Sequence, residues 1–173
     1  RSQVYILQST NSRIYNMAGL KRRLEGEIEI RAAGGDAFHE ILVNRPHHLT
    51  NVNPGLVQGC DLHEGTFGKQ GSKICWRYTV DGKALSATQI LEVIDEENKV
   101  IKFNVIEGDL MKEYKSLVIT YQVIPKGENS SIVKWIFDYE KLHAGIPEPT
   151  SSLDALIRLA KEMDDHHHHG RAR

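Results

Sequence analysis

The residues of this chain whose types and spacing are best suited to chemistry include a cluster of glycines near position 68. Gly65, Gly68 and Gly71 recur at intervals of three. Glycine permits positive φ and close backbone approach, and phosphate-binding loops use both properties. A P-loop also needs a Lys-Ser/Thr pair followed by a helix, whereas here Ser72 precedes Lys73 and a strand-like run follows. The pattern therefore favours a tight connection between two strands over a nucleotide site.

His63 and Glu64, just before that loop, form the pair best suited to general acid–base chemistry. Such chemistry needs an ionisable group whose pKa is shifted towards neutrality by its surroundings. Residues that flank a polar loop more often form a solvated surface cluster. Four lysines are further candidate acids or bases. They lie at strand positions that are expected to point outward or at strand ends: Lys102, Lys115, Lys134 and Lys141. No Ser-His-Asp order, zinc spacing or nucleotide motif is present, so the sequence assigns no catalytic residue, no metal site and no cofactor.

The overall composition excludes several classes of partner. The chain has 173 residues, with 22 Lys and Arg against 23 Asp and Glu, so its net charge of −1 indicates neither nucleic acid nor an acidic membrane. No apolar run approaches the roughly 20 residues that cross a bilayer. We expect residues 17–165 to form one domain, residues 1–16 to be a non-native or upstream extension without a secretory signal, and residues 166–173 to be a flexible His-containing tail.

The segment at 150–165 predicts a long amphipathic helix, and the rest of the chain is organised around it. Its apolar side chains recur at steps of three and four and share one face: Leu153, Leu156, Ile157, Ala160 and Met163. Pro147 and Pro149 prevent an earlier start. A helix with one apolar face needs a surface to cover.

Antiparallel strands supply that surface. Period-2 alternation, bounded by turn residues, predicts seven strands at 20–31, 57–63, 73–80, 84–94, 100–106, 115–124 and 132–142. Asp81-Gly82 is a strong hairpin signal. A short helix is expected at 36–43, started by a break at Gly34-Gly35, with a second short helix or a loop at 47–54. The fold class is therefore α+β.

The inward strand faces combine aliphatic side chains with polar ones. The strand at 84–94, for example, places Gln89 on one face with Leu85, Ala87, Leu91 and Val93. Aromatic and aliphatic residues on such a face usually form a packed core. However, a buried hydroxyl or amide without a partner costs about 1–3 kcal/mol, and a cavity that holds water or a ligand would provide partners. The residues alone leave a packed core and a binding cavity equally open.

The order of elements, together with four stretches, resembles the plant major latex proteins, a branch of the Bet v I type, pathogenesis-related class-10 superfamily. The stretches are VQGCDLHEGTFGKQGS (57–72), DGKALSA (81–87), VIEGDLMKEYKS (105–116) and WIFDYEKLH (135–143). This resemblance, which covers residues 19–165, implies a helix-grip fold. In that fold a seven-stranded antiparallel sheet wraps around a long C-terminal helix, with two short helices after the first strand. It also implies an internal cavity for small hydrophobic or amphipathic ligands such as sterols, hormones, flavonoids or alkaloids.

We expect the ligand to contact inward-facing residues of the sheet and of the helix: Phe38, Tyr78, Gln89, Phe103, Tyr121, Tyr139, Leu153, Leu156, Ile157 and Ala160. Phe67 and the glycines at 65, 68 and 71 are expected at the cavity entrance. These assignments assume that side chains alternate strictly between the two faces of each strand. A β-bulge would turn the side chains that follow it to the opposite face.

Three functions are compatible with this reading. The favoured one is a cytosolic, monomeric or weakly dimeric carrier or sensor of small hydrophobic ligands. The cytosolic location and a link to plant defence or stress come with the resemblance. The alternative is an isomerase or condensing enzyme of plant specialised metabolism, which requires an ionisable side chain in the cavity. A third is a protein-interaction module that uses the loops at 64–70 or 107–113.

Overall fold

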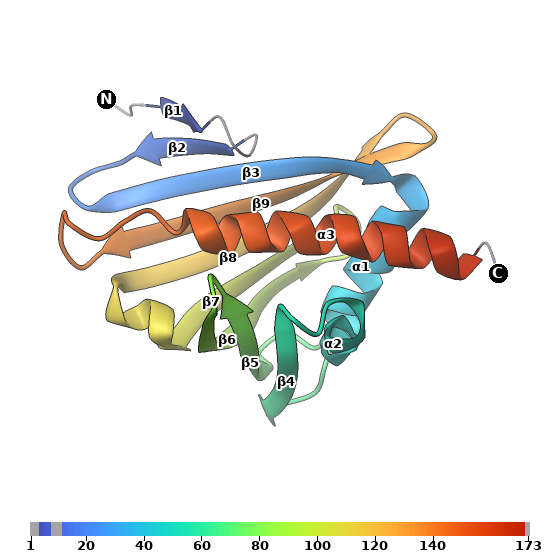
Figure 1. The fold of residues 1–173 in the computed structure, drawn as a ribbon, viewed down its shortest axis with the longest axis horizontal. Coiled ribbons are helices and arrows are strands. Elements are labelled where there is room, and N and C mark those ends of the chain that lie inside the picture. The colour runs from blue at the N-terminus through green and yellow to red at the C-terminus, as the bar shows by residue number, and fades with distance from the viewer. Residues whose placement is uncertain (1–3, 8–11, 172–173) are drawn as a thin grey trace.

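The computed structural model describes residues 4–7 and 12–171, and within them nine strands form one antiparallel sheet (Figure 1). The strands are β1 Val4–Leu7, β2 Ser12–Asn16, β3 Lys21–Arg31, β4 Val57–Glu64, β5 Lys73–Val80, β6 Lys83–Asp95, β7 Val100–Gly108, β8 Tyr114–Lys126 and β9 Ser130–Lys141. The helices are α1 Ala32–Asn44, α2 Leu49–Val52 and α3 Thr150–Arg171, with 3-10 turns η1 Pro46–His48 and η2 Asp109–Lys112.

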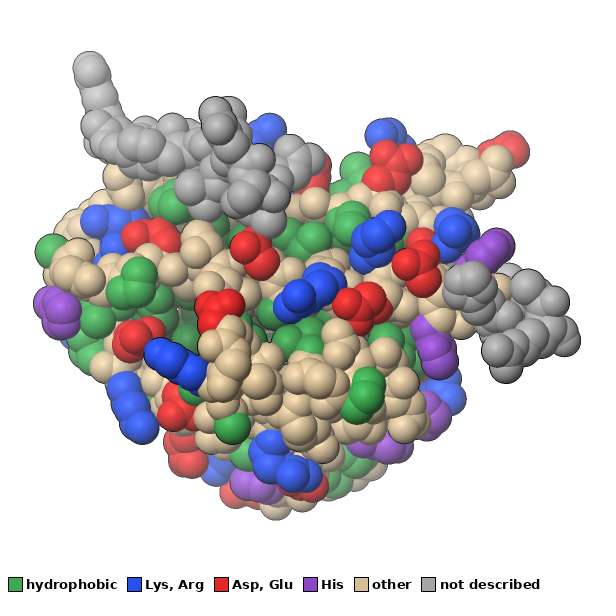
Figure 2. All heavy atoms as spheres, viewed as in Figure 1, with side chains coloured by type: hydrophobic (Ala, Val, Ile, Leu, Met, Phe, Trp, Pro, Cys, Tyr) green, Lys and Arg blue, Asp and Glu red, His purple; other side chains and the backbone are tan. Residues whose placement is uncertain are grey.

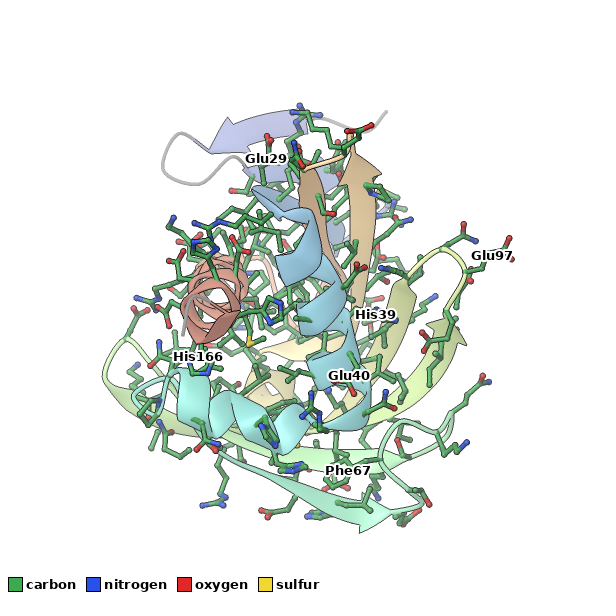
Figure 3. All side chains as sticks on the ribbon, turned by 90° about the vertical axis from the view of Figure 1, so that its right-hand side faces the viewer. Glu29, His39, Glu40, Phe67, Glu97 and His166 are labelled. Atoms are coloured by element: carbon green, nitrogen blue, oxygen red, sulfur yellow. The ribbon has the colours of Figure 1, made fainter. Side chains whose placement is uncertain are left out.

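The strand order is β1-β2-β3-β9-β8-β7-β6-β5-β4. Strands β4 to β9 follow one another as a meander, and β3 closes the order by pairing antiparallel with β9. Seen along α3, the sheet curls around the helix (Figure 3). The helix-grip fold is therefore confirmed, with β3 to β9 as the seven predicted strands. Strands β1 and β2 come from the segment expected to be an extension. They widen the sheet by adding two strands beside β3.

Alternation along the strands separates a buried face from an exposed one. In β9, Val133, Trp135, Phe137 and Tyr139 are all at most 3% exposed, as the period-2 pattern predicts. The prediction was wrong at Val93, which is 40% exposed. A register shift between Leu91 and Val93 in the β6–β7 pairing reverses the parity beyond that point.

The β5–β6 hairpin turns at Asp81 and Gly82, as the sequence predicts. Both residues have positive φ, 52° and 76°. Two consecutive left-handed residues match the twist of the flanking strands, which is why Asp-Gly is favoured there.

Helix α1 begins at Ala32, four residues before the predicted start at Asp36. The sequence predicts a helix break at Gly34-Gly35, but Gly35 lies inside the helix where α1 meets the sheet. A Cβ at Gly35 would lie 3.0 Å from Val123 and 3.1 Å from Ser131. The missing side chain therefore permits close helix–sheet packing rather than ending the helix.

Helix α3 begins at the predicted Thr150 but continues through the His run to Arg171, beyond the predicted end at Asp165. It crosses the concave face of the sheet and contacts α1 and β3 most extensively (Figure 1). Its outward face carries mixed charge (Figure 2), with Arg158 and Lys161 exposed. No helix in the described part of the chain is long and apolar enough to cross a membrane.

Candidate functional site

A cavity lies between the inner face of the sheet and α3, with α1, α2 and η2 contributing to its walls. The volume open to the centres of water-sized molecules is about 120 Å³. An apolar cavity of about 150 Å³ can hold benzene. The space is therefore close in size to a single small ring.

The wall is predominantly apolar. Its apolar members are Leu42, Leu49, Leu56, Val57, Val80, Ala87, Phe103, Val105, Leu110, Ile119, Phe137, Ala155, Leu156 and Leu159. Its side chains that carry a hydrogen-bonding group are Trp76, Tyr78, Gln89, Trp135 and Ser152. Among the described residues that line the cavity, none carries a carboxylate, an amine, a guanidinium or an imidazole group.

Four residues expected to contact ligand lie in this wall: Tyr78 on β5, Gln89 on β6, Phe103 on β7 and Leu156 on α3. Gln89 is 7% exposed, which is unusual for an amide side chain. Alternation alone was enough to orient the three strand residues.

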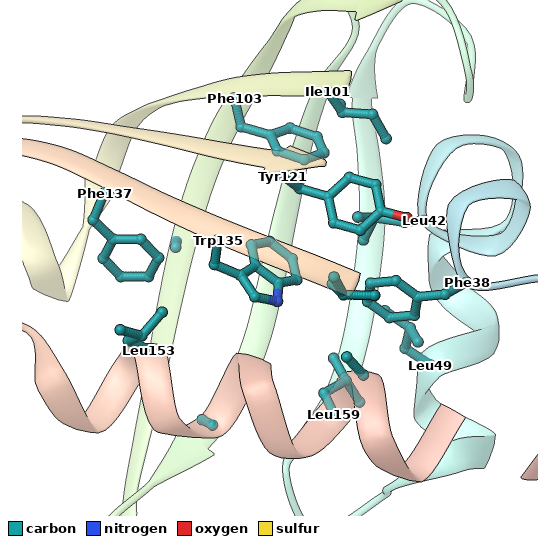
Figure 4. Close-up of a cluster of buried hydrophobic side chains, with 14 of the residues drawn as sticks. Phe38, Leu42, Leu49, Ile101, Phe103, Tyr121, Trp135, Phe137, Leu153 and Leu159 are labelled. Carbon is teal, nitrogen blue, oxygen red and sulfur yellow. The ribbon is translucent and has the colours of Figure 1, made fainter. Parts of the chain in front are cut away.

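Phe38 and Tyr121 lie beside the cavity in an aromatic cluster rather than in its wall (Figure 4). Their ring centroids are 5.3 Å apart in an edge-to-face arrangement. Trp135, which does line the cavity, contacts both rings, at 6.1 Å from Phe38 and 5.2 Å from Tyr121. Both side chains are fully buried, so in this conformation they act as core residues behind the wall.

Leu153, Ile157 and Ala160 also lie outside the cavity wall. Leu153 and Ile157 pack against β3 where Gly26 has no side chain. A Cβ at Gly26 would lie 2.7 Å from Ile157 and 2.9 Å from Leu153. Part of the predicted apolar face of α3, formed by Leu153 and Ile157, therefore packs directly on the sheet instead of facing the cavity.

A second stripe of α3 borders the cavity instead, formed by Ser152, Ala155, Leu156 and Leu159. Sequence reasoning missed three of these residues, although they recur at the same helical spacing. Ser152 is polar, Ala155 is small and Leu159 falls between predicted apolar positions. A prediction based on large apolar side chains alone therefore misidentifies the side of α3 that faces the cavity.

Tyr139 lies away from the cavity, in a buried polar cluster at the start of α3. Its hydroxyl group donates to Glu148 Oε1 at 3.0 Å, and Lys141 Nζ donates to Glu148 Oε2 at 2.6 Å. Lys141 is 7% exposed, so this lysine is paired and buried rather than outward-facing. Burial and the nearby Glu148 carboxylate raise the pKa of Tyr139, and the phenol stays protonated as a donor.

The glycine loop connects β4 and β5 outside the cavity wall. Gly65, Gly68 and Gly71 all have positive φ, between 80° and 87°, so their conformation requires glycine. The loop is tied to β6, because the Gly71 amide donates to the carbonyl oxygen of Leu91 at 2.7 Å. Phe67, which is labelled in Figure 3, packs against His47 of η1, and their ring centroids are 5.4 Å apart. A role for this loop at an entrance stays a prediction.

Two buried donors in the cavity wall have no hydrogen-bond partner within the described part of the chain. They are the Tyr78 hydroxyl group and the Trp135 indole Nε1. Burial, with a smaller contribution from Asp109, raises the pKa of Tyr78 to about 12. The phenol is therefore neutral and able to donate at physiological pH.

The remaining chemical candidates from the sequence do not meet the cavity. His63 and Glu64 are exposed and absent from its wall. Glu64 lies 3.7 Å from Lys73 as a surface ion pair. Within residues 4–7 and 12–171, no group of three or more His, Cys, Asp or Glu side chains is arranged to hold a metal ion.

Comparison with known proteins agrees with this geometry. Residues 19–169 match the model of the pathogenesis-related protein Bet v 1 family. MLP-like protein 31 of Arabidopsis thaliana is 47% identical over 145 residues, which are 83% of this chain and 84% of that protein. The crystal structure of ginseng major latex-like protein 151 from Panax ginseng superimposes with a TM-score of 0.82 at 44% identity, covering 86% of this chain and 99% of that one.

A more distant likeness extends to an enzyme. Norcoclaurine synthase of Thalictrum flavum, solved as a point mutant with a transition-state analogue, has a TM-score of 0.67 at 19% identity. It covers 88% of this chain and 99% of that one, and at this identity the likeness concerns the fold alone. The sequence and structural matches together show that this chain belongs to the Bet v 1 family and, within it, to the major latex proteins.

Proposed function

We propose that this protein binds small hydrophobic or amphipathic molecules in the cavity between α3 and the sheet, and acts as a carrier or sensor for them. The observation that carries the proposal is the cavity itself, with its apolar wall and its few hydrogen-bonding groups. Small-molecule sites in proteins commonly combine these two features.

The size of the cavity limits what it holds in this conformation. The space of about 120 Å³ corresponds to about one ring, and a two-ring compound would need a small outward movement of the walls. Drug-sized ligands occupy sites of about 300–1,000 Å³. A sterol or a large flavonoid would require outward movement of the closing helices. Asn53, which follows α2, donates to Glu162 of α3 at 2.6 Å, so this contact must loosen if those two helices separate.

The enzyme alternative finds less support in the wall chemistry. An isomerase or condensing enzyme would need a group that exchanges protons near neutral pH. Among the described wall residues only Tyr78 ionises, and burial raises its pKa to about 12. A phenol of this kind can orient a ligand by a hydrogen bond but is a poor base at neutral pH.

Membership of the pathogenesis-related Bet v 1 family motivates a place in plant defence or stress responses, and a cytosolic location is part of the same proposal. The specific ligand class is open among sterols, hormones, flavonoids and alkaloids.

Native mass spectrometry and dye displacement with a panel from these four classes would test the proposal. We expect at least one class to bind with a Kd in the micromolar range and to compete with an apolar dye. Absence of binding at tens of micromolar across the whole panel would contradict the proposal.

A further inference from the structure

The cavity wall has no charged group among the described residues. In the described part of the chain, every wall residue is apolar or neutral at physiological pH. A carboxylate, phosphate or ammonium group moved into such surroundings loses its hydration and gains no counter-ion. The wall therefore opposes charged ligands while accepting neutral apolar ones.

The same wall presents hydrogen-bond donors that are not used by the protein. The indole N–H of Trp135 can only donate, and the neutral hydroxyl of Tyr78 can donate as well. Both atoms are buried and lack a partner in the described part of the chain. Figure 4 shows the indole nitrogen on the ring edge that faces α3, the helix that carries Leu159. Leu159 also borders the cavity.

Buried polar atoms without partners are rare in native proteins, and each lowers stability until something bonds to it. A ligand oxygen beside either donor would relieve that cost. An apolar ligand without an acceptor would leave the cost in place.

We infer that the cavity selects neutral ligands, made of an apolar ring body and a hydrogen-bond-accepting oxygen, over charged ligands with the same body. Carbonyl, ether and hydroxyl oxygens all qualify as acceptors. This inference rests on the proposed function, because it takes the cavity as the ligand site, and it narrows that function to neutral oxygenated compounds.

Three two-ring probes of nearly equal size separate the effects of a hydrogen-bond acceptor and of a charge on ligand affinity: 2-acetylnaphthalene, 2-ethylnaphthalene and 2-naphthoate. The first has a carbonyl acceptor, the second has no acceptor and the third is an anion at neutral pH. Their affinities for the full chain can be measured by quenching of tryptophan fluorescence and confirmed by NMR titration.

We expect 2-acetylnaphthalene to bind about 3- to 10-fold more tightly than 2-ethylnaphthalene, the range of one net hydrogen bond. It should bind at least about ten-fold more tightly than 2-naphthoate at pH 7, because an unpaired buried charge is costly. Lowering the pH towards about 4, where a carboxyl group becomes protonated, should bring the naphthoate affinity closer to that of the ketone.

Variants test which donors are responsible. Trp135→Phe and Tyr78→Phe should each reduce the preference for the acetyl over the ethyl probe, and the double variant should abolish it. Tyr121→Phe is the matched control, because its hydroxyl is also buried without a partner in the described part of the chain but lies outside the cavity wall. It should leave the preference unchanged. Thermal unfolding verifies that each variant is folded, and Tyr78→Phe remains informative if the tryptophan variant is not.

Equal binding of naphthoate and acetylnaphthalene would overturn the inference while leaving the cavity as the ligand site. A preference for the acetyl probe that survives in the double variant would overturn the assignment of the donors. Failure of all three probes to bind would contradict the proposed function, and the inference with it.

Discussion

Replacing Ala155 by leucine tests whether the space beneath α3 is free. Ala155 is 4% exposed and lines the cavity from the helix side. Leucine is a good helix former, so the change does not conflict with the secondary structure. In a cavity the larger side chain fills unoccupied space, whereas in a packed core it would collide with its neighbours.

The expected gain in stability follows from the added carbon atoms. Leucine has three more than alanine, and each buried methylene contributes about 0.8 kcal/mol, so the gross gain is at most about 2.4 kcal/mol. Ordering the leucine side chain costs about 0.5–1 kcal/mol. The free energy of unfolding should therefore rise by about 1.5 kcal/mol, which raises Tm by about 3–6 °C in a domain of this size. Ligand affinity should fall at least about ten-fold, because the same space is no longer available.

Ala160→Leu is the matched control on the same helix. Ala160 is fully buried but absent from the cavity wall. Overpacking at such a site typically costs about 1–3 kcal/mol, so this variant should be destabilised. Urea unfolding and fluorescence titration of both variants measure the two effects. If Ala155→Leu loses as much stability as Ala160→Leu, there is no free space beside Ala155 and the reasoning fails.

Three further predictions concern hydrogen bonds and protonation. Tyr121→Phe removes a buried hydroxyl group without a partner in the described part of the chain and should raise the free energy of unfolding by about 1 kcal/mol or more, whereas Tyr139→Phe, which breaks a bond to Glu148, should lower it by about 1–2 kcal/mol; equal losses in urea unfolding would contradict this difference. Asn53→Ala removes the bond to Glu162 and should speed ligand association and dissociation several-fold in stopped-flow fluorescence, whereas unchanged rates would show that these helices do not open for the ligand. Affinity for a neutral ligand should be constant from about pH 6 to pH 9, because the single phenol of the wall has its pKa raised to about 12 and stays protonated below it; a ten-fold change in calorimetric Kd would refute this.

The sheet was predictable from local patterns because its inner face follows strict alternation over long strands. In β7, Ile101, Phe103 and Val105 are all buried at every second position. Val93 shows where this approach fails. A bulge depends on pairing with the neighbouring strand, and a single strand carries no signal of that pairing.

The helices were less predictable, because their contacts depend on residues distant in the sequence. Whether Leu153 faces the cavity or the sheet is decided by Gly26, more than a hundred positions away, which lets α3 approach β3. Tyr139 was expected at the ligand because its parity is inward. It is instead paired with Glu148, which the loop before α3 folds back onto β9.

The sequence predicts the cavity only because it resembles the major latex proteins. Alternation places apolar side chains on one face, but it does not say whether the helix above fills the hollow. That outcome depends on small differences in helix position, such as those allowed by Gly26 and Gly35.

The most direct test of the central claim is to locate a bound ligand in solution by nuclear Overhauser effects between 2-acetylnaphthalene and the methyl groups of the labelled protein. The structure predicts cross-peaks to Ala155, Leu156 and Ile119, all of which line the cavity. Cross-peaks confined to exposed methyl groups, such as those of Met17 at 50% exposure and Leu142 at 49%, would contradict a ligand site between α3 and the sheet.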